Sequence, residues 1–298
     1  MKSMRLHIYI VLAIFVIGFI VGSFVDLSLS TAIFSRGNGF GLTIAAIGVL
    51  PGCMIFAVLG GCFLALSLHK DYKKVWKVVL FILTIIALVA SIYFSGQEFF
   101  GENGFYNPSL DKWLGYVIAA PFAAGCGYLG YLMGRKSENP YLWIILLIAV
   151  AVAFIALVPG VTLIKSIFHR PRFRTVTLYE GIEFHSWWQR TSNYAELMQI
   201  YGVSKEEFKS FPSGHVGESS VLLVGATFLP LINPKYQKYQ LPLFYCGLVW
   251  TLLVGFTRIL VGAHFLSDVS MGGLLMTLFL LIGNEVTIAL NKKYHFAE

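Results

Sequence analysis

The chain has 298 residues, of which 57% are hydrophobic and 12% are charged, and its formal net charge is +7. Soluble globular domains carry about 25% charged residues. This composition excludes an ordinary soluble domain, and we interpret the chain as an integral membrane protein.

The apolar residues are gathered in runs that predict about eight transmembrane helices, each needing roughly 20 residues to cross the hydrocarbon core. Continuous apolar runs without strict alternation exclude a β-barrel, so the predicted fold is all-α, a polytopic helical bundle. The first run follows Lys2 and Arg5, but it is longer than the apolar core of a signal peptide, so we expect a retained helix. The spans are predicted near 6–25, 42–68, 78–95, 114–134, 142–164, 216–233, 241–257 and 269–290.

Lys and Arg in the short loops predict the orientation of the bundle, because such loops stay in the cytoplasm. The amino-terminal tip, the loops 69–77, 135–140 and 234–238, and the tail 291–298 hold more than half of the 22 basic residues. Both termini are therefore expected to be cytoplasmic. Residues 165–211 would then be external although they are basic, and positive charge kept beside the membrane on that side indicates an anion to bind.

Three polar clusters fall on this external side: LIKSIFHRPRFR after the fifth span, FPSGH before the sixth, and TRILVGAHFLSD between the seventh and the eighth. Lys165, Arg172 and Arg258 offer ammonium and guanidinium donors that suit phosphate oxygens. Ser213 and Gly214 begin the sixth helix, where unpaired backbone N–H groups attract an anion. We predict that these five residues bind a phosphate group.

His264 and Asp268 are four residues apart, so a helical turn places them on one face. An aspartate that accepts the imidazole N–H fixes the tautomer and raises the basicity of the other ring nitrogen. This pattern predicts His264 as the nucleophile towards phosphorus and His215 as the acid that protonates the leaving alcohol. Glu218, one turn past His215, either tunes that histidine or caps the helix, and both interpretations stay open.

Taken together, Lys165-x6-Arg172, Pro212-Ser213-Gly214-His215 and Arg258-x5-His264-x3-Asp268 resemble the three-part signature of the type 2 phosphatidic acid phosphatase (PAP2) superfamily. Within it, the chain looks like the membrane lipid phosphatases. The resemblance implies hydrolysis without a metal ion or other cofactor. It also implies a phosphohistidine at the third-motif histidine, an acid and then a base at the second-motif histidine, and a lysine and arginines that hold the phosphoryl oxygens.

Two positions depart from the family pattern. Phe173 follows Arg172 where the family usually has proline, and Thr257 stands where serine is usual. The first departure makes Arg170 an alternative to Arg172 as the phosphate-binding arginine of this motif, or a tuning residue. The resemblance also suggests a division of the chain. Residues 1–141 would be accessory and amino-terminal helices, 142–290 a catalytic core with the external loop 173–211, and 291–298 a cytoplasmic tail.

The remaining basic residues of the external segment are expected to be solvated or to contact lipid headgroups. Its aromatic residues predict either a belt at the membrane interface or a lid, residues 174–209, that lies on the bilayer and guides a lipid to the site. The basic residues in question are Arg170, Arg174, Arg190, Lys205 and Lys209.

The sequence thus predicts a phosphatase for a phosphate monoester or pyrophosphate of a membrane lipid, such as phosphatidate, phosphatidylglycerol phosphate or polyprenyl pyrophosphate. Two alternatives remain: a hydrolase of a soluble sugar phosphate that resembles glucose-6-phosphatase, and a non-catalytic phospholipid binder or transporter. We expect membrane lipids and a lipid phosphate substrate as partners, and no nucleic acid. The expected location is a bacterial plasma membrane with the site outside, or a lumen-facing site in a eukaryote.

Overall fold

The computed structural model of the protein describes residues 4–70, 72–100 and 113–294, and within these residues all regular secondary structure is helical. Eight helices in this part of the chain are long and apolar enough to cross a membrane, which confirms the predicted fold. They are α1 (Met4–Ile33), α2 (Gly39–Ile47) with α3 (Leu50–Ser67), α4 (Lys74–Phe99), α5 (Trp113–Gly134), α6 (Leu142–Ile155) with the π-helix η1 (Ala156–Leu163) and α7 (Ile164–Phe168), α10 (Gly214–Ser219) with α11 (Val221–Ile232), α12 (Gln237–Leu260) and α13 (Leu266–Tyr294).

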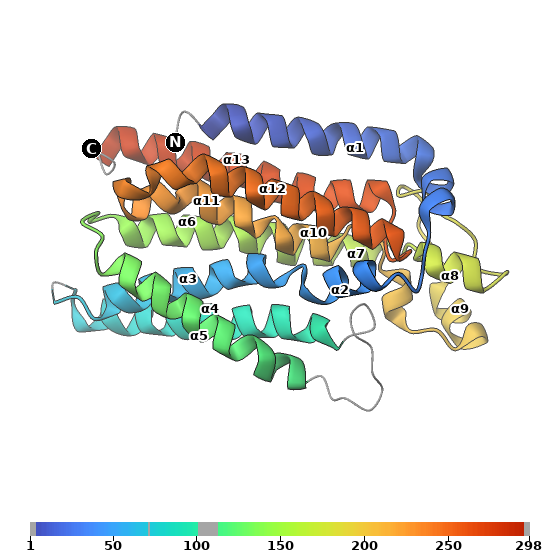
Figure 1. Ribbon diagram of the computed structural model, residues 1–298, viewed down its shortest axis with the longest axis horizontal. Helices are drawn as coiled ribbons and strands as arrows, with labels where there is room; N and C mark the ends of the chain where they lie inside the picture. The colour runs from blue at the N-terminus through green and yellow to red at the C-terminus, as the bar shows by residue number, and fades with distance from the viewer. Residues whose placement is uncertain (1–3, 71, 101–112, 295–298) are drawn as a thin grey trace.

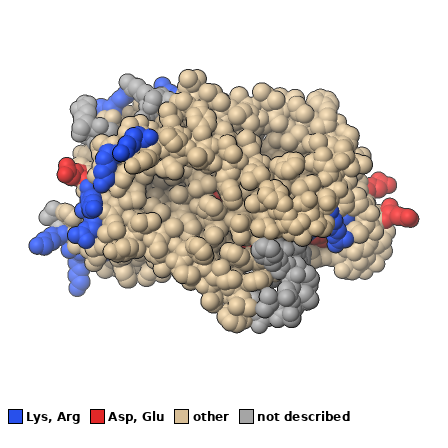
Figure 2. Space-filling model, in the orientation of Figure 1, with Lys and Arg blue, Asp and Glu red and all other residues tan. Residues whose placement is uncertain are grey.

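Both termini lie at one end of the bundle, and the short helices α8 (Phe173–Leu178) and α9 (Tyr194–Tyr201) lie at the other end (Figure 1). On the face drawn in Figure 2, Lys and Arg lie mainly at the end with the termini, and a broad band with almost no charged side chains separates the two ends. The cytoplasmic position of the termini stays a prediction. Lys2 and residues 295–298 of the predicted tail lie outside the described residues.

Large apolar side chains are exposed on the outer faces of the spans. Phe24 on α1, Val75 on α4 and Val249 on α12 are 85%, 72% and 65% exposed. Exposed apolar surface on this scale marks a membrane-facing or interaction surface rather than a soluble one. The exposed apolar side chains are consistent with helices that lie in a membrane.

Helix α3 joins the two halves of the bundle, because it packs against α4 and α5 on one side and against α6, α10 and α11 on the other. It comes close to α10 at Gly52, where an added Cβ would lie 2.0 Å from the backbone oxygen of Glu218. Small residues at such points allow helix backbones in membranes to come together. The amino-terminal helices are thereby held against the helix that begins at Gly214.

Candidate active site

Backbone and side-chain hydrogen bonds bring the three predicted clusters together at the end of the bundle opposite the termini. His264 Nδ1 lies 2.6 Å from the backbone oxygen of Ser210, which precedes the FPSGH motif. The backbone N–H of Ser213 donates to the backbone oxygen of Asp268 at 2.9 Å. The second and third motifs are therefore parts of a single site.

The first motif reaches the same site through two cations. A Cβ added to Gly214 would lie 3.6 Å from Lys165 Nζ, so the ammonium group sits beside the start of α10. Arg172 is buried, and it donates from Nε to the backbone oxygen of Glu206 at 2.9 Å and from Nη1 to that of Ala263 at 3.1 Å. These bonds fix the guanidinium beside the turn that carries the third motif.

That turn folds back on Arg258, the last basic residue of α12. The backbone oxygen of Arg258 accepts the N–H groups of Ala263 and His264 at 3.0 and 3.2 Å. Gly262 has a φ of 69°, in the left-handed region that favours glycine, and a Cβ there would lie 2.5 Å from the Phe34 ring. The glycine therefore allows the tight turn that joins the fully buried Arg258 to His264.

His264 is held by a carbonyl rather than by a carboxylate, which differs from the expected direct bond to Asp268. The separation between Nδ1 and Asp268 Oδ2 is 3.8 Å, too long for a hydrogen bond. Asp268 Oδ2 instead accepts from Ser210 Oγ at 2.5 Å and from the Phe265 N–H at 2.8 Å. Asp268 thus orients the loop whose backbone oxygen holds the imidazole, and it acts on the ring through its charge.

The tautomer of His264 follows from this contact. A carbonyl oxygen can only accept, so Nδ1 carries the hydrogen and Nε2 keeps its lone pair. Burial, together with the positive charges of Arg172, Lys165 and Arg258, holds the pKa of His264 well below its usual range, although Asp268 opposes this. At neutral pH the ring is therefore uncharged and Nε2 is a competent nucleophile.

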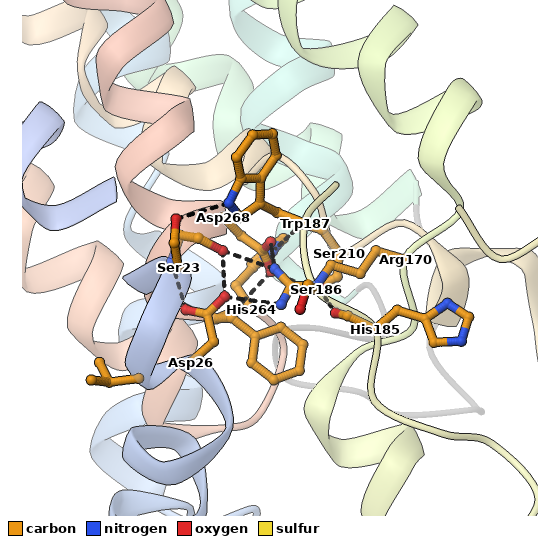
Figure 3. A network of polar contacts seen from close by, with 12 residues as sticks. Ser23, Asp26, Arg170, His185, Ser186, Trp187, Ser210, His264 and Asp268 are labelled. Carbon is orange, nitrogen blue, oxygen red and sulfur yellow. Dashed lines mark hydrogen bonds and ion pairs between the residues drawn. The ribbon is translucent and has the colours of Figure 1, made fainter. Parts of the chain in front are cut away.

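Arg170 occupies the centre of a buried ion network, drawn in Figure 3. Its Nη1 donates to Asp268 Oδ1 at 2.5 Å and to Ser267 Oγ at 2.9 Å, its Nη2 donates to Asp26 Oδ2 at 2.9 Å, and its Nε donates to the backbone oxygen of His185 at 2.8 Å. The guanidinium is fully buried and lies 4.1 Å from the centre of the Phe265 ring. The interpretation of Arg170 as a solvated or headgroup-binding residue is therefore wrong, and its donors are directed at protein acceptors.

Arg174 is also not a free surface cation. Its guanidinium forms an ion pair with Glu207 that leaves the two side chains 11% and 16% exposed. Although burial alone would raise the pKa of Glu207, the hydrogen bond from Arg174 and the nearby charge of Arg172 lower it to about 2. Arg190 and Lys205 are exposed, and Lys209 pairs with Glu206, while contact of these residues with lipid headgroups stays a prediction.

His215, at the start of α10, is buried. Its Nε2 lies 3.2 Å from the backbone oxygen of Ala45 and 3.3 Å from Glu98 Oε2. Ser213 Oγ and Glu218 Oε2 are buried, and neither has a hydrogen-bond partner among the described residues. Both atoms are therefore available to a ligand or to water, and the two interpretations of Glu218 stay predictions.

Asp26 and Glu98 were missed by the sequence interpretation, although each has a recognisable signal. Each is a carboxylate at the end of a long apolar run, and ionisable residues in such positions are costly unless they serve a function. The predicted spans 6–25 and 78–95 ended just before these two residues. The structure extends both helices by at least one turn and brings the carboxylates to the site.

The aromatic residues of the external segment pack partly onto the protein. Trp187 donates from Nε1 to Ser23 Oγ on α1 at 2.9 Å and stacks on Phe211, with 5.8 Å between ring centres. Phe184 packs edge-on against Phe265. His185 and Trp187 therefore lie beside the ion network (Figure 3), and the Phe184 ring packs 5.4 Å from the Arg170 guanidinium. Trp188 is 53% exposed and is available to a membrane interface.

Comparison with known proteins gives one match. A family model for the PAP2 superfamily matches residues 114–290, which is more than half of the chain. No curated protein and no solved structure matches the chain. The matched region contains all three motifs and excludes Asp26 and Glu98, and the match supports phosphatase activity on phosphate esters. By its sequence and by the helices that carry these motifs, the chain belongs to the PAP2 superfamily.

Proposed function

We propose that the protein hydrolyses a phosphate monoester or pyrophosphate of a membrane lipid at the outer membrane face, through a phosphohistidine at His264 and without a metal ion. The observation that carries this proposal is the state of His264. Its Nδ1 is tied to the Ser210 carbonyl at 2.6 Å, so Nε2 keeps its lone pair inside a buried cluster of cations. A neutral, oriented imidazole beside cations is what attack on a phosphate dianion requires.

In the first step, His264 Nε2 attacks phosphorus, the new N–P bond forms, and the bond from phosphorus to the lipid oxygen breaks. Lys165, Arg172 and Arg258 neutralise the charge on the phosphoryl oxygens, and the Ser213 hydroxyl is available as a further donor. His215 as imidazolium gives its proton to the leaving oxygen, so that an alcohol departs from a monoester and a lipid monophosphate departs from a pyrophosphate.

In the second step, water attacks the phosphohistidine and the N–P bond breaks. His215, now neutral, accepts the proton from the attacking water and returns to the imidazolium form. Inorganic phosphate leaves, and His264 recovers its lone pair. The sum of the two steps is monoester plus water to alcohol plus phosphate, or pyrophosphate plus water to lipid monophosphate plus phosphate, with no other reactant.

A lipid substrate is supported by the position of the site, at the end of a bundle of apolar helices whose middle carries almost no charged side chains on the face drawn in Figure 2. The outer location is supported by the basic loops at the opposite end, which favour the cytoplasm. Phosphatidate, phosphatidylglycerol phosphate and polyprenyl pyrophosphate all present a phosphate at the depth of the headgroups.

The test is phosphate release by the purified protein in detergent micelles with excess EDTA. Each of the three lipids and glucose 6-phosphate is supplied separately, and a His264→Ala variant is the control. We expect at least one lipid to be hydrolysed faster than glucose 6-phosphate. Preference for the sugar phosphate would overturn the lipid assignment, and activity that EDTA removes and magnesium restores would overturn the metal-free mechanism.

A further inference from the structure

Glu98 brings a carboxylate into the site from a helix outside the matched family region. It lies near the end of α4, and its Oε2 is 3.3 Å from His215 Nε2. Its side chain is only 16% exposed. The backbone oxygen of Ala45 on α2 shares the same ring nitrogen at 3.2 Å. Two acceptors from the amino-terminal helices thus converge on one side of the His215 ring.

The charges that act on Glu98 come from several elements. Its positively charged neighbours are Lys165 on α7 and Arg258 on α12, and Arg172, at the start of α8, is also within electrostatic reach. The other acidic and thiol groups near it are Glu218 on α10 and Cys53 on α3. His215 is therefore set between a group of cations, which disfavour its protonated form, and a carboxylate, which favours it.

We propose that Glu98 is a positioning residue that orients the His215 imidazole and stabilises its protonated form for the acid step. The proposal rests on the proposed function, because it assumes that His215 protonates the leaving oxygen. Glu98 accepts a hydrogen bond from Nε2–H and itself exchanges no proton with the substrate. When His215 donates, its N–H bond breaks, an O–H bond forms on the leaving group, and the carboxylate remains ionised.

This arrangement is similar in logic to a base oriented by a buried carboxylate in a catalytic triad. The cations expected to hold the phosphoryl group disfavour a proton on His215. The carboxylate of Glu98, 3.3 Å from His215 Nε2, opposes their effect from the side of the amino-terminal helices. On this account, α4 supplies part of the acid–base machinery and is more than an accessory to the bundle.

The test compares pH–rate profiles of the wild type, Glu98→Gln and Ser95→Ala, all purified in detergent. Glutamine keeps the size of Glu98 and removes its charge. Ser95 is a matched control, because it is fully buried on the same helix and, among the described residues, its hydroxyl donates to backbone oxygens of that helix. The substrates are phosphatidate, whose alkoxide needs a proton to leave, and p-nitrophenyl phosphate, whose leaving group hardly needs one.

We expect the alkaline side of the pH–rate profile for phosphatidate, its alkaline limb, to move to lower pH by about one unit in Glu98→Gln. The reason is that an opposite charge at this range shifts a pKa by about 1–3 units. Ser95→Ala should leave the limb in place. The first step on p-nitrophenyl phosphate, measured as the burst of p-nitrophenol, should change less than threefold. Glu98→Gln should also add no further loss in a His215→Asn background, because a residue that acts through another is not additive with it.

Three results would overturn the proposal: an alkaline limb that does not move, losses that multiply in the double variant, or tighter orthovanadate binding with an unchanged limb. The last would mean that Glu98 stands in the phosphate pocket. If Glu98→Gln does not fold, Glu98→Asp replaces it, because aspartate keeps the charge at a longer distance from His215. Its alkaline limb should move in the same direction by a smaller amount, and an unchanged limb would contradict the proposal. Failure of the proposed function itself would appear separately, as a wild type inactive on every phosphate ester in EDTA.

Discussion

Replacing Asp26 by asparagine tests the buried ion network that links α1 to the third motif. Asp26 Oδ2 accepts from Arg170 Nη2 at 2.9 Å, and its Oδ1 accepts the Ser267 N–H at 2.9 Å. Asparagine keeps the shape and removes the charge. The network contains two carboxylates and one guanidinium, so the variant leaves Arg170 neutralised by Asp268 at 2.5 Å.

The expected magnitude follows from this charge balance. Loss of one hydrogen bond to a charged group costs about 1.5–3 kcal/mol, and the free energy of unfolding should fall by that amount in Asp26→Asn. Arg170→Met should cost more, about 3–5 kcal/mol, because it leaves two buried carboxylates without their cation. The order of the two variants is the informative quantity.

The assay is unfolding of the purified protein by sodium dodecyl sulfate in mixed micelles, followed by tryptophan fluorescence. Ser30→Ala is the matched control, because Ser30 is fully buried one turn further along α1 and its Oγ has no hydrogen-bond partner within the described residues. It should stay within about 0.5 kcal/mol of the wild type. An Asp26→Asn protein as stable as the wild type, or an Arg170→Met protein more stable than Asp26→Asn, would refute the reasoning.

Three further predictions concern chemistry and topology. The pH profile of kcat/KM for p-nitrophenyl phosphate, corrected for ionisation of the substrate, should fall on its acid side with a midpoint below the ordinary histidine pKa of about 6.5. The reason is that the lowered pKa of His264 keeps the nucleophile neutral as the pH falls. A midpoint above that value would contradict this assignment. Orthovanadate should inhibit competitively in excess EDTA, as a mimic of the five-coordinate phosphorus, and inhibition that requires a metal ion would count against the site. In intact cells, a membrane-impermeant thiol reagent should label Glu180→Cys and spare Lys73→Cys, and the reverse labelling would invert the topology.

The eight spans and the three motifs could be predicted because their signals are local. A run of about 20 apolar residues predicts a span by length alone. The fixed spacing of Arg258, His264 and Asp268 marks a motif wherever the chain folds. These features need no knowledge of which helices become neighbours.

The role of Arg170 could not be predicted, because it depends on partners that are distant in the sequence. Nothing local distinguishes Arg170, which is fully buried, from the exposed Arg190. Its acceptors on α1 and α13 are brought together only by helix packing. The same holds for Glu98, whose contact with His215 requires α4 to lie against the catalytic half of the bundle.

The backbone carbonyl that holds His264 was missed for a different reason. The i, i+4 spacing of His264 and Asp268 is correct for a shared helical face, but α13 begins only at Leu266. His264 therefore lies in the turn before the helix, where Ser210 is the nearer acceptor. A pattern based on spacing cannot show whether both residues are inside one helix.

The most direct test of the account is to trap the phosphoenzyme. His215→Ala should form the N–P bond with a labelled aryl phosphate and then stall, because the base that activates water is missing. The label should accumulate as an acid-labile, base-stable adduct that maps to His264, and it should be absent from the His215→Ala, His264→Ala double variant. Label that persists in the double variant, or that maps to Ser213, would contradict the assignment of His264 as the nucleophile.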